Sequence, residues 1–369
     1  MHDFERSMPM TEKILKVLTA RSDAALDVQC RDIIGQIENP LTTLSIVFFY
    51  DAGSLEEYLG YDRILQDVCK EYLGEDKPLV SFVAQAPVSG KLTAEVLSIK
   101  GAGEVECNGD YLLVNSEDGT ELFSQGIHFP EAGDVGEQSV KVFSRIKEIL
   151  DTEGFTPSDI VRQWNYIDHI TQVNDGLQNY QMFNDARSAF YQDADWSGGY
   201  PAATGIGCST GGVMVSIYAV KDSTAVSKPV DNPIQIPAHK YSGKVLEAGR
   251  QEIRTTPKFE RARLLGNTVY VSGTAAIKGE DSEFSKDAKV QSEGLIDVVE
   301  HLVAPVNIGP EFSKFQFELL RIYVKYPEDA GTIMECIGDR WKGVPMHFLI
   351  ADICRPELLL ELEGIGKAF

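Results

Sequence analysis

Hydrophobic and polar residues alternate with two different periods along this chain of 369 residues. Apolar residues with helical spacing predict helices at 10–20 and 54–74, and Ser54 is a candidate N-cap of the second. Short runs rich in β-branched and aromatic residues predict strands at 44–52, 79–87 and 91–99. The first hundred residues are therefore expected to be mixed α/β, and no catalytic motif stands out in them.

From about residue 120 one order of elements occurs twice: strand, helix, strand, helix, strand, strand. The first copy runs from ELFSQGIHF at 121–129 to YPAATGIGCSTGGVMVSIYAV at 200–220. The second runs from NTVYVSGTAAI at 267–277 to VPMHFLIADICRPELLLELEGI at 344–365. Such self-similarity predicts duplication of one α/β unit. A chance alignment of two α/β segments of similar order remains the alternative.

The segment between the two copies has four prolines and little hydrophobic periodicity. A long stretch of this kind is either a linker or a functional loop laid over a site. Its basic and aromatic residues favour the loop, although exposed basic residues are also ordinary in linkers. The residues concerned are Tyr241, Arg250, Arg254, Arg261 and Arg263.

Composition narrows the classes of function. The formal net charge of −22 argues against nucleic acid as a partner, because phosphate binding depends on clustered Lys and Arg. An anionic ligand would need a few specific arginines inside an acidic molecule. The six cysteines include no CxxC pair and are expected to be free thiols. No apolar stretch approaches the ~18 residues that span a bilayer, so we expect a cytoplasmic protein without a membrane partner.

The last strand-like segment, ADICRPELLLELEGIGKAF at 351–369, carries two glutamates in an apolar run. Alternate residues of an extended chain share a face. The expected faces are Leu358, Leu360 and Leu362 towards the core, and Leu359, Glu361 and Glu363 on the opposite side. The two carboxyls would lie about 7 Å apart, close enough for each to disfavour ionisation of the other where water is excluded. A polar outer face of a half-exposed strand is the alternative.

Six segments, in order along the chain, carry a resemblance to a known family. They are WNYI at 164–167, LQNYQMFNDARSAFY at 177–191, YPAATGIG at 200–207, NPIQIPA at 232–238, PKFERARLLGNTVYVSGTAAI at 257–277 and CRPELLLELEG at 354–364. In this combination the chain from about Arg162 to its end resembles the chorismatases, which have the YjgF/RidA fold. The resemblance implies an α/β (α+β) protein with two tandem YjgF/RidA-like units, each a mixed six-stranded sheet with two helices on one face. The implied division is an N-terminal domain at 1–220, a connecting segment at 221–260 and a C-terminal domain at 261–369 that holds the active site.

The resemblance also implies a reaction, cleavage of the enolpyruvyl ether of chorismate to pyruvate and either a hydroxybenzoate or a dihydroxycyclohexadiene carboxylate. It implies no metal and no cofactor. An enol ether is cleaved by protonating its terminal methylene, which requires a carboxylic acid still protonated near neutral pH. The two substrate carboxylates require cations, and the planar fork of Arg suits them best.

By register with the family's closing motif, Glu361 is the implied proton donor and Glu363 its tuning partner. Two positions are implied to influence which product forms. One is Cys354, seven residues earlier, and the other is the small residue of the SGTAA segment, Ala275 or Ala276. Arg261 is the best match to a substrate-binding arginine of the family. The other candidates for substrate contact are Arg355, Lys325, Arg162, Ala275, Glu363 and Tyr270. For Tyr270, the strand pattern favours core packing.

Two differences from the expected family pattern bear on the alternative functions. RidA-type imine deaminases use an arginine on the strand before the closing one, where this chain has Met346 and His347. The closing strand of the first copy, VMVSIYAV, carries no Glu, so one site per chain is expected. A RidA-like imine deaminase and a non-catalytic metabolite-binding protein remain alternatives. The expected partner is a small anionic, chorismate-like molecule, and the chain is either a homotrimer or a pseudo-oligomeric monomer.

Overall fold

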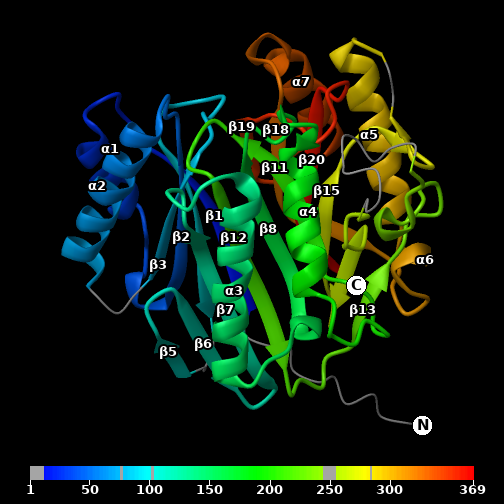
Figure 1. Ribbon diagram of the computed structural model, residues 1–369, viewed down its shortest axis with the longest axis horizontal. Coiled ribbons are helices and arrows are strands. Elements are labelled where there is room, and N and C mark those ends of the chain that lie inside the picture. Colours follow the sequence, from blue (N-terminus) through cyan, green and yellow to red (C-terminus); the bar gives the residue numbers. More distant parts are fainter. Residues whose placement is uncertain (1–11, 75–77, 101–103, 244–254, 283–284) are drawn as a thin grey trace.

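The computed structural model describes residues 12–74, 78–100, 104–243, 255–282 and 285–369. Three larger sheets follow one another along this described chain, with helices packed on their outer faces (Figure 1). Two short hairpins complete the strands: β9 (Val173–Asn174) with β10 (Leu177–Gln178), and β16 (Ile277–Lys278) with β17 (Asp281–Ser282).

The second sheet has six strands in the order β11-β8-β12-β7-β6-β5, in which only β8 and β11 are parallel. Its elements in chain order are β5 (Glu104–Cys107), β6 (Tyr111–Ser116), β7 (Gly119–His128), α3 (Val135–Glu153), β8 (Ile160–Asp168), α4 (Asn179–Phe190), β11 (Ala202–Cys208) and β12 (Val213–Lys221).

The third sheet repeats this topology as β13-β14-β15-β20-β18-β19, again with one parallel pair, β18 and β19. Its elements are β13 (Ser227–Val230), β14 (Ala262–Leu265), β15 (Thr268–Thr274), α5 (Ala288–Leu302), α6 (Pro305–Ile308), β18 (Phe315–Val324), α7 (Ala330–Arg340), β19 (Met346–Ile350) and β20 (Leu360–Ala368). The predicted fold class and the two tandem six-stranded units are therefore confirmed.

The first sheet is a shortened third copy that the sequence did not reveal. Its order, β1-β4-β2-β3 with β2 and β3 parallel, matches the last four strands of the other two sheets. It lacks only the opening two strands. Its elements are β1 (Glu12–Thr19), α1 (Leu26–Ile34), β2 (Thr43–Tyr50), α2 (Leu55–Leu73), β3 (Leu79–Ala84) and β4 (Thr93–Lys100).

Two expectations change as a result. The helix predicted at 10–20 is wrong, because Glu12–Thr19 is strand β1 and pairs with β4 along its whole length. The apolar pairs Ile14-Leu15 and Val17-Leu18 fit either period, and pairing with β4 decides the outcome. The proposed first domain, 1–220, holds two sheets, and the connecting segment, 221–260, already contains the first strand of the third sheet.

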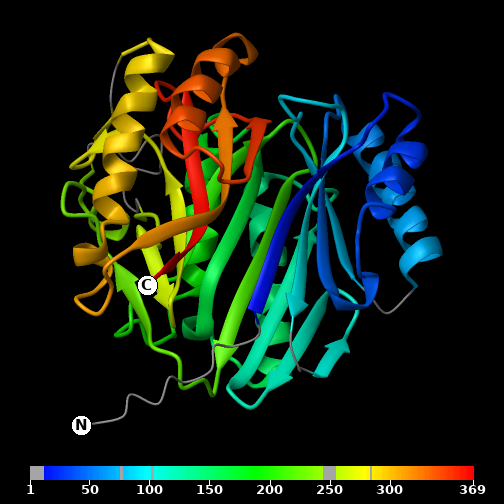
Figure 2. The same cartoon turned by 180° about the vertical axis from the view of Figure 1, so that it is seen from behind.

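The inner faces of the three sheets line a central cavity of about 1140 Å³. Each sheet contributes to its wall, for example through Lys13, Trp164 and Ile365. Viewed from behind, the strands lie between α1 and α2 on one side and α5 and α7 on the other (Figure 2). The helices α5 and α7 cover the outer face of the third sheet over an apolar core that includes Leu295, Ile333 and Leu362.

The closing strand β20 has two different faces. Leu360 and Leu362 belong to the core under the helices, as expected, whereas Glu361 and Glu363 point inward. The expected alternation begins only at Leu360, where the strand starts, so Leu359 joins the core as well.

Close packing of β20 against β18 leaves no room for a side chain at Gly366. A Cβ there would lie 2.4 Å from Phe315 Cζ and 2.6 Å from the Gln316 carbonyl oxygen. We therefore expect Gly366→Ala to lower the free energy of unfolding by about 1–3 kcal/mol in urea titration. Gly338→Ala on α7, where a Cβ meets nothing within 4 Å, should be neutral or stabilising. Equal losses in the two variants would contradict this account of β20.

Candidate active site

A small cavity of about 60 Å³ lies where the second sheet meets the third. Its walls come from α4, from the segment before β14, from β15 and from the loop that leads into β20. The lining residues are Gln178, Tyr180, Gln181, Asn184, Tyr241, Pro257, Phe259, Arg261, Gly273, Ala275, Ile277, Cys354, Arg355 and Glu361. No residue of the first sheet is among them.

Glu361 is the carboxyl of this cavity. It lies opposite Tyr323 in the register of β18 and β20 and is only 4% exposed. Gly273 makes room for it, because a Cβ at that position would lie 2.1 Å from Glu361 Oε1. In the part of the chain that the structure describes, no hydrogen bond or ion pair holds the Glu361 carboxyl. The group is thus buried, uncompensated and turned towards a cavity.

This environment favours the acid form of Glu361. Burial raises its pKa to about 8, and the nearby negative charge of Glu363 adds to the effect. The positive charges of Arg162 and Arg261 act in the opposite direction and are outweighed. At neutral pH the group can donate a proton.

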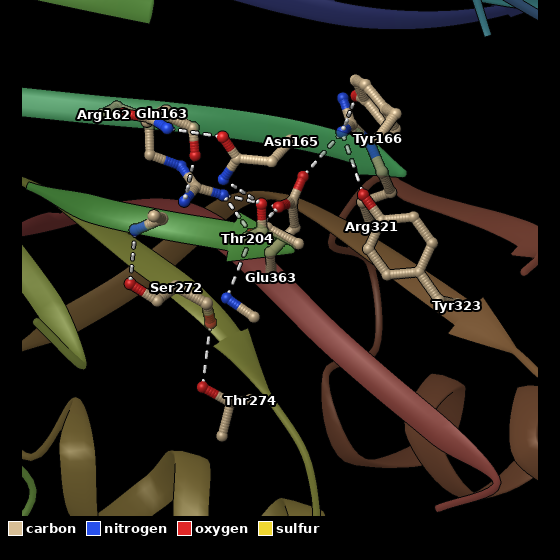
Figure 3. Close-up of polar contacts among 12 residues, drawn as sticks. Arg162, Gln163, Asn165, Tyr166, Thr204, Ser272, Thr274, Arg321, Tyr323 and Glu363 are labelled. Atoms are coloured by element: carbon tan, nitrogen blue, oxygen red, sulfur yellow. Dashed lines mark hydrogen bonds and ion pairs between the residues drawn. The ribbon is translucent and has the colours of Figure 1, made fainter. Parts of the chain in front are cut away.

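Glu363, two residues further along the same face, has a different environment. Its carboxylate accepts from Arg162 Nη2 at 2.5 Å, pairs with Arg321 Nη1 at 2.7 Å and also accepts from the Thr204 hydroxyl (Figure 3). Arg321 in turn forms a two-point ion pair with Glu95 of the first sheet.

Charge counting explains the contrast between the two glutamates. Two arginines, Arg162 and Arg321, face two carboxylates, Glu363 and Glu95, and all four side chains are buried. Glu361 is the third carboxyl, with no arginine left to pair with it inside this cluster. An uncompensated buried carboxylate is costly, so the group keeps its proton.

Cys354 lies in the same cavity as a thiol. Burial, followed by the charge of Glu361, raises its pKa to about 12. A resting thiolate nucleophile at this position is therefore excluded at neutral pH. The neutral thiol can still shape the cavity or exchange a hydrogen bond with a bound molecule.

Arg261 and Arg355 bring positive charge to the cavity. Arg261 Nη2 donates to the Ile236 carbonyl at 2.7 Å and to the Tyr241 hydroxyl at 2.5 Å. Its Nε is buried and has no partner among the described residues, so it can donate to a ligand carboxylate. Arg355 is held by Ser282 Oγ and the Glu280 carbonyl, and it lies over the Tyr241 ring.

Besides Glu363, three expected contact residues lie outside this cavity. Arg162 is paired with Glu363, and Tyr270 packs at a tilt against the Tyr218 ring on the wall of the central cavity. Lys325 pairs with Asp352 at 3.1 Å and donates to the Pro356 carbonyl at 2.8 Å. Glu361, Cys354, Arg261, Arg355 and Ala275 do line the cavity, and their roles remain predictions.

The remaining basic residues considered from the sequence do not line the cavity or lie outside the described residues. Arg263 donates to the carbonyls of residues 198–200 and is structural in its contacts. Arg250 and Arg254 lie outside the described residues. His347 occupies the position at which RidA-type enzymes were expected to have an arginine. It contacts Glu95 and Thr93 and does not line the cavity.

The α4 residues Tyr180, Gln181 and Asn184 were missed as cavity residues. The available signal was their place in LQNYQMFNDARSAFY, one of the segments that carry the family resemblance. No group of three His, Cys, Asp or Glu side chains able to hold a metal occurs within the described ranges. None of the described helices is both long and apolar enough to cross a membrane.

Comparison with known proteins agrees with the resemblance. Residues 99–219 match the family described as "Chorismatase FkbO/Hyg5-like, N-terminal". The chain is 27% identical over 269 residues to a 3-hydroxybenzoate synthase of Streptomyces hygroscopicus, covering 69% of this chain and 76% of that protein. It is 29% identical over 253 residues to a chorismatase of Streptomyces rapamycinicus, covering 64% and 72%. A crystal structure of a chorismatase superposes with a TM-score of 0.73 at 21% identity, over 97% of this chain and 99% of that one.

The raised pKa of Glu361 predicts a pH-dependent stability. Because the folded value, about 8, lies above that of an unfolded Glu, the stabilisation is complete below the unfolded pKa and is lost as pH rises through about 8. Glu361→Gln removes this dependence. The free energy of unfolding of the variant, relative to that of the wild type, should therefore rise by up to ~5 kcal/mol between acidic and mildly alkaline pH. Urea unfolding at a series of pH values measures it. Exposed Glu335→Gln serves as control, and parallel wild-type and Glu361→Gln curves would refute the assignment.

Proposed function

We propose that this chain, which shares the chorismatase fold and resembles that family in sequence, cleaves the enolpyruvyl ether of chorismate and releases pyruvate. The observation that carries the proposal is a buried glutamic acid, Glu361, which faces a small cavity beside Arg261 and whose pKa is raised by burial to about 8. That is the group which enol ether cleavage requires. The relatives named above are a 3-hydroxybenzoate synthase and a chorismatase.

In the proposed reaction Glu361 gives its proton to the terminal methylene of the enolpyruvyl group, which becomes a methyl. The ether carbon then carries positive charge as an oxocarbenium ion, which the newly formed Glu361 carboxylate stabilises by its own charge. In the hydrolytic course, water adds to that carbon and returns a proton to Glu361. The resulting hemiketal breaks its bond to the ring oxygen, leaving pyruvate and a dihydroxycyclohexadiene carboxylate.

In the alternative course the ring also loses one molecule of water and becomes aromatic. Chorismate is then converted to pyruvate and a hydroxybenzoate, and no net water is consumed. Cys354 lies in the cavity as a neutral thiol, next to Arg355. It stands where it could contact the substrate ring and bias the outcome between the two courses. The cations for the substrate carboxylates are Arg261, through its unpartnered Nε, and Arg355.

The direct test is pyruvate release from chorismate, followed with a coupled lactate dehydrogenase assay. We expect release by the wild type and at least ~100-fold less by Glu361→Gln, since general acid catalysis typically contributes 10²–10⁴-fold. Glu318→Gln, an exposed carboxylate on the adjacent strand β18, should retain full activity. A wild type without pyruvate release, or a Glu361→Gln variant as fast as the wild type, rules the proposal out.

Cys354 is tested by product identity. Cys354→Ala should change the ratio of hydroxybenzoate to dihydroxycyclohexadiene carboxylate, while pyruvate release stays within ~10-fold of wild type because the acid is untouched. Chromatography of the aromatic and cyclic products measures the ratio. Cys336→Ala on α7 is the matched control. An unchanged product ratio in Cys354→Ala removes Cys354 from the product choice.

A further inference from the structure

Glu95 lies on β4 of the first sheet, which contributes no residue to the candidate active site. Its two carboxylate oxygens accept from Arg321 Nε, at 2.7 Å, and from Arg321 Nη2. His347 Nδ1 lies 2.7 Å from Glu95 Oε1, and its Nε2 lies 2.8 Å from the Thr93 hydroxyl. Burial opposes ionisation of Glu95, but Arg321 and then His347 outweigh it and lower its pKa to about 2. Glu95 is therefore a fixed negative charge.

Arg321 connects this charge to the site. Its Nη1 pairs with Glu363 at 2.7 Å and donates to the hydroxyls of Tyr166 and Tyr323 at 2.8 and 3.1 Å. Glu363 in turn forms an ion pair with Arg162 (Figure 3). The four charged side chains thus alternate in sign from the first sheet, through the third, to the second.

The same contact occurs twice in the repeated fold. Arg162 on β8 and Arg321 on β18 hold matching places, opposite Tyr218 and Glu363 on the closing strands of their own sheets. Each arginine also reaches a carboxylate on the closing strand of another sheet, Glu363 for Arg162 and Glu95 for Arg321. Both acceptor carboxylates, Glu363 and Glu95, thus lie on closing strands.

We propose that Glu95 is a positioning residue for the acid: by neutralising Arg321 it keeps the cluster beside Glu361 balanced in charge, so that Glu361 stays in its proton-bearing form. This inference rests on the proposed role of Glu361 as general acid. Without the Glu95 charge, the cluster of two arginines and Glu363 has a net positive charge. Such a cluster stabilises the Glu361 carboxylate and weakens the acid.

Other groups also act on Glu361, and all of them stay in place in the test below. Those that face it or act on it from the surrounding elements are Glu363, Tyr323, Arg162, Arg261, Tyr180, Cys354, Arg355 and Tyr241.

The test compares the pH dependence of kcat for chorismate cleavage among the wild type, a variant without the Glu95 charge, a variant without the Arg321 charge and a variant without both. Glu95→Gln should move the alkaline loss of activity down by about one pH unit, and Arg321→Met should move it up. The double variant Glu95→Gln/Arg321→Met restores the charge balance and should lie closer to wild type than either single variant. It also leaves no member of that ion pair buried alone, which protects its folding. Glu121→Gln, a buried carboxylate paired with Lys13 on the same central cavity, should not move the profile.

A purely structural role for Glu95 would lower kcat without shifting the profile in opposite directions in the two single variants. Unmoved profiles, or a double variant no closer to wild type, overturn the proposal. A second readout needs no turnover: the pH dependence of the stability difference that Glu361→Gln causes in each background. If no pyruvate forms but this readout shifts as predicted, the proposed function fails and the role of Glu95 stands. If pyruvate forms and neither readout shifts, only the role of Glu95 fails.

Discussion

Three buried arginine–carboxylate contacts, Arg162 with Glu363 and Arg321 with both Glu363 and Glu95, fasten the three sheets of this protein together. Ion pairs removed from water return their desolvation cost only with good geometry and further hydrogen bonds. Thr204, Tyr166 and His347 supply those bonds. The cluster matters for function because it balances its own charges and leaves no arginine of the cluster to form an ion pair with the neighbouring Glu361. The same arrangement therefore joins the sheets and prepares an acid.

Repetition of one βαβαββ unit explains where that acid lies. Three sheets around a central cavity create several places where the closing strand of one sheet meets another sheet. By strand register, the second sheet has Ser216 where the third has Glu361, since Ser216 lies opposite Trp164 and Glu361 opposite Tyr323. The small cavity is found beside Glu361, and its other wall is α4 of the second sheet. The expectation of one site per chain, based on the missing Glu in the closing strand at 213–220, is consistent with Ser216 at this place.

The sequence predicted the duplicated unit and the shared face of Glu361 and Glu363, because strand periodicity and element order are local properties. Strand periodicity could not distinguish the environments of the two glutamates. Although they are only two residues apart on β20, Glu361 faces the small cavity and Glu363 lies in the ion cluster. Nor could the sequence place Arg162, whose partner Glu363 is distant in the chain. The shortened unit of the first sheet escaped notice because it lacks the opening hairpin and because residues 12–19 fit both periods. The α4 residues Tyr180 and Asn184 were missed because their role arises only where two sheets meet.

The central claim is that Glu361 bears a proton at neutral pH because it is buried beside a charge-balanced cluster. Infrared difference spectroscopy of wild type against Glu361→Gln observes that proton directly, through the carbonyl stretch of a protonated carboxylic acid. The account predicts a band in the wild type at neutral pH that is absent from the variant and disappears as pH rises through about 8. A wild type that shows only the carboxylate band for Glu361 at neutral pH would contradict it.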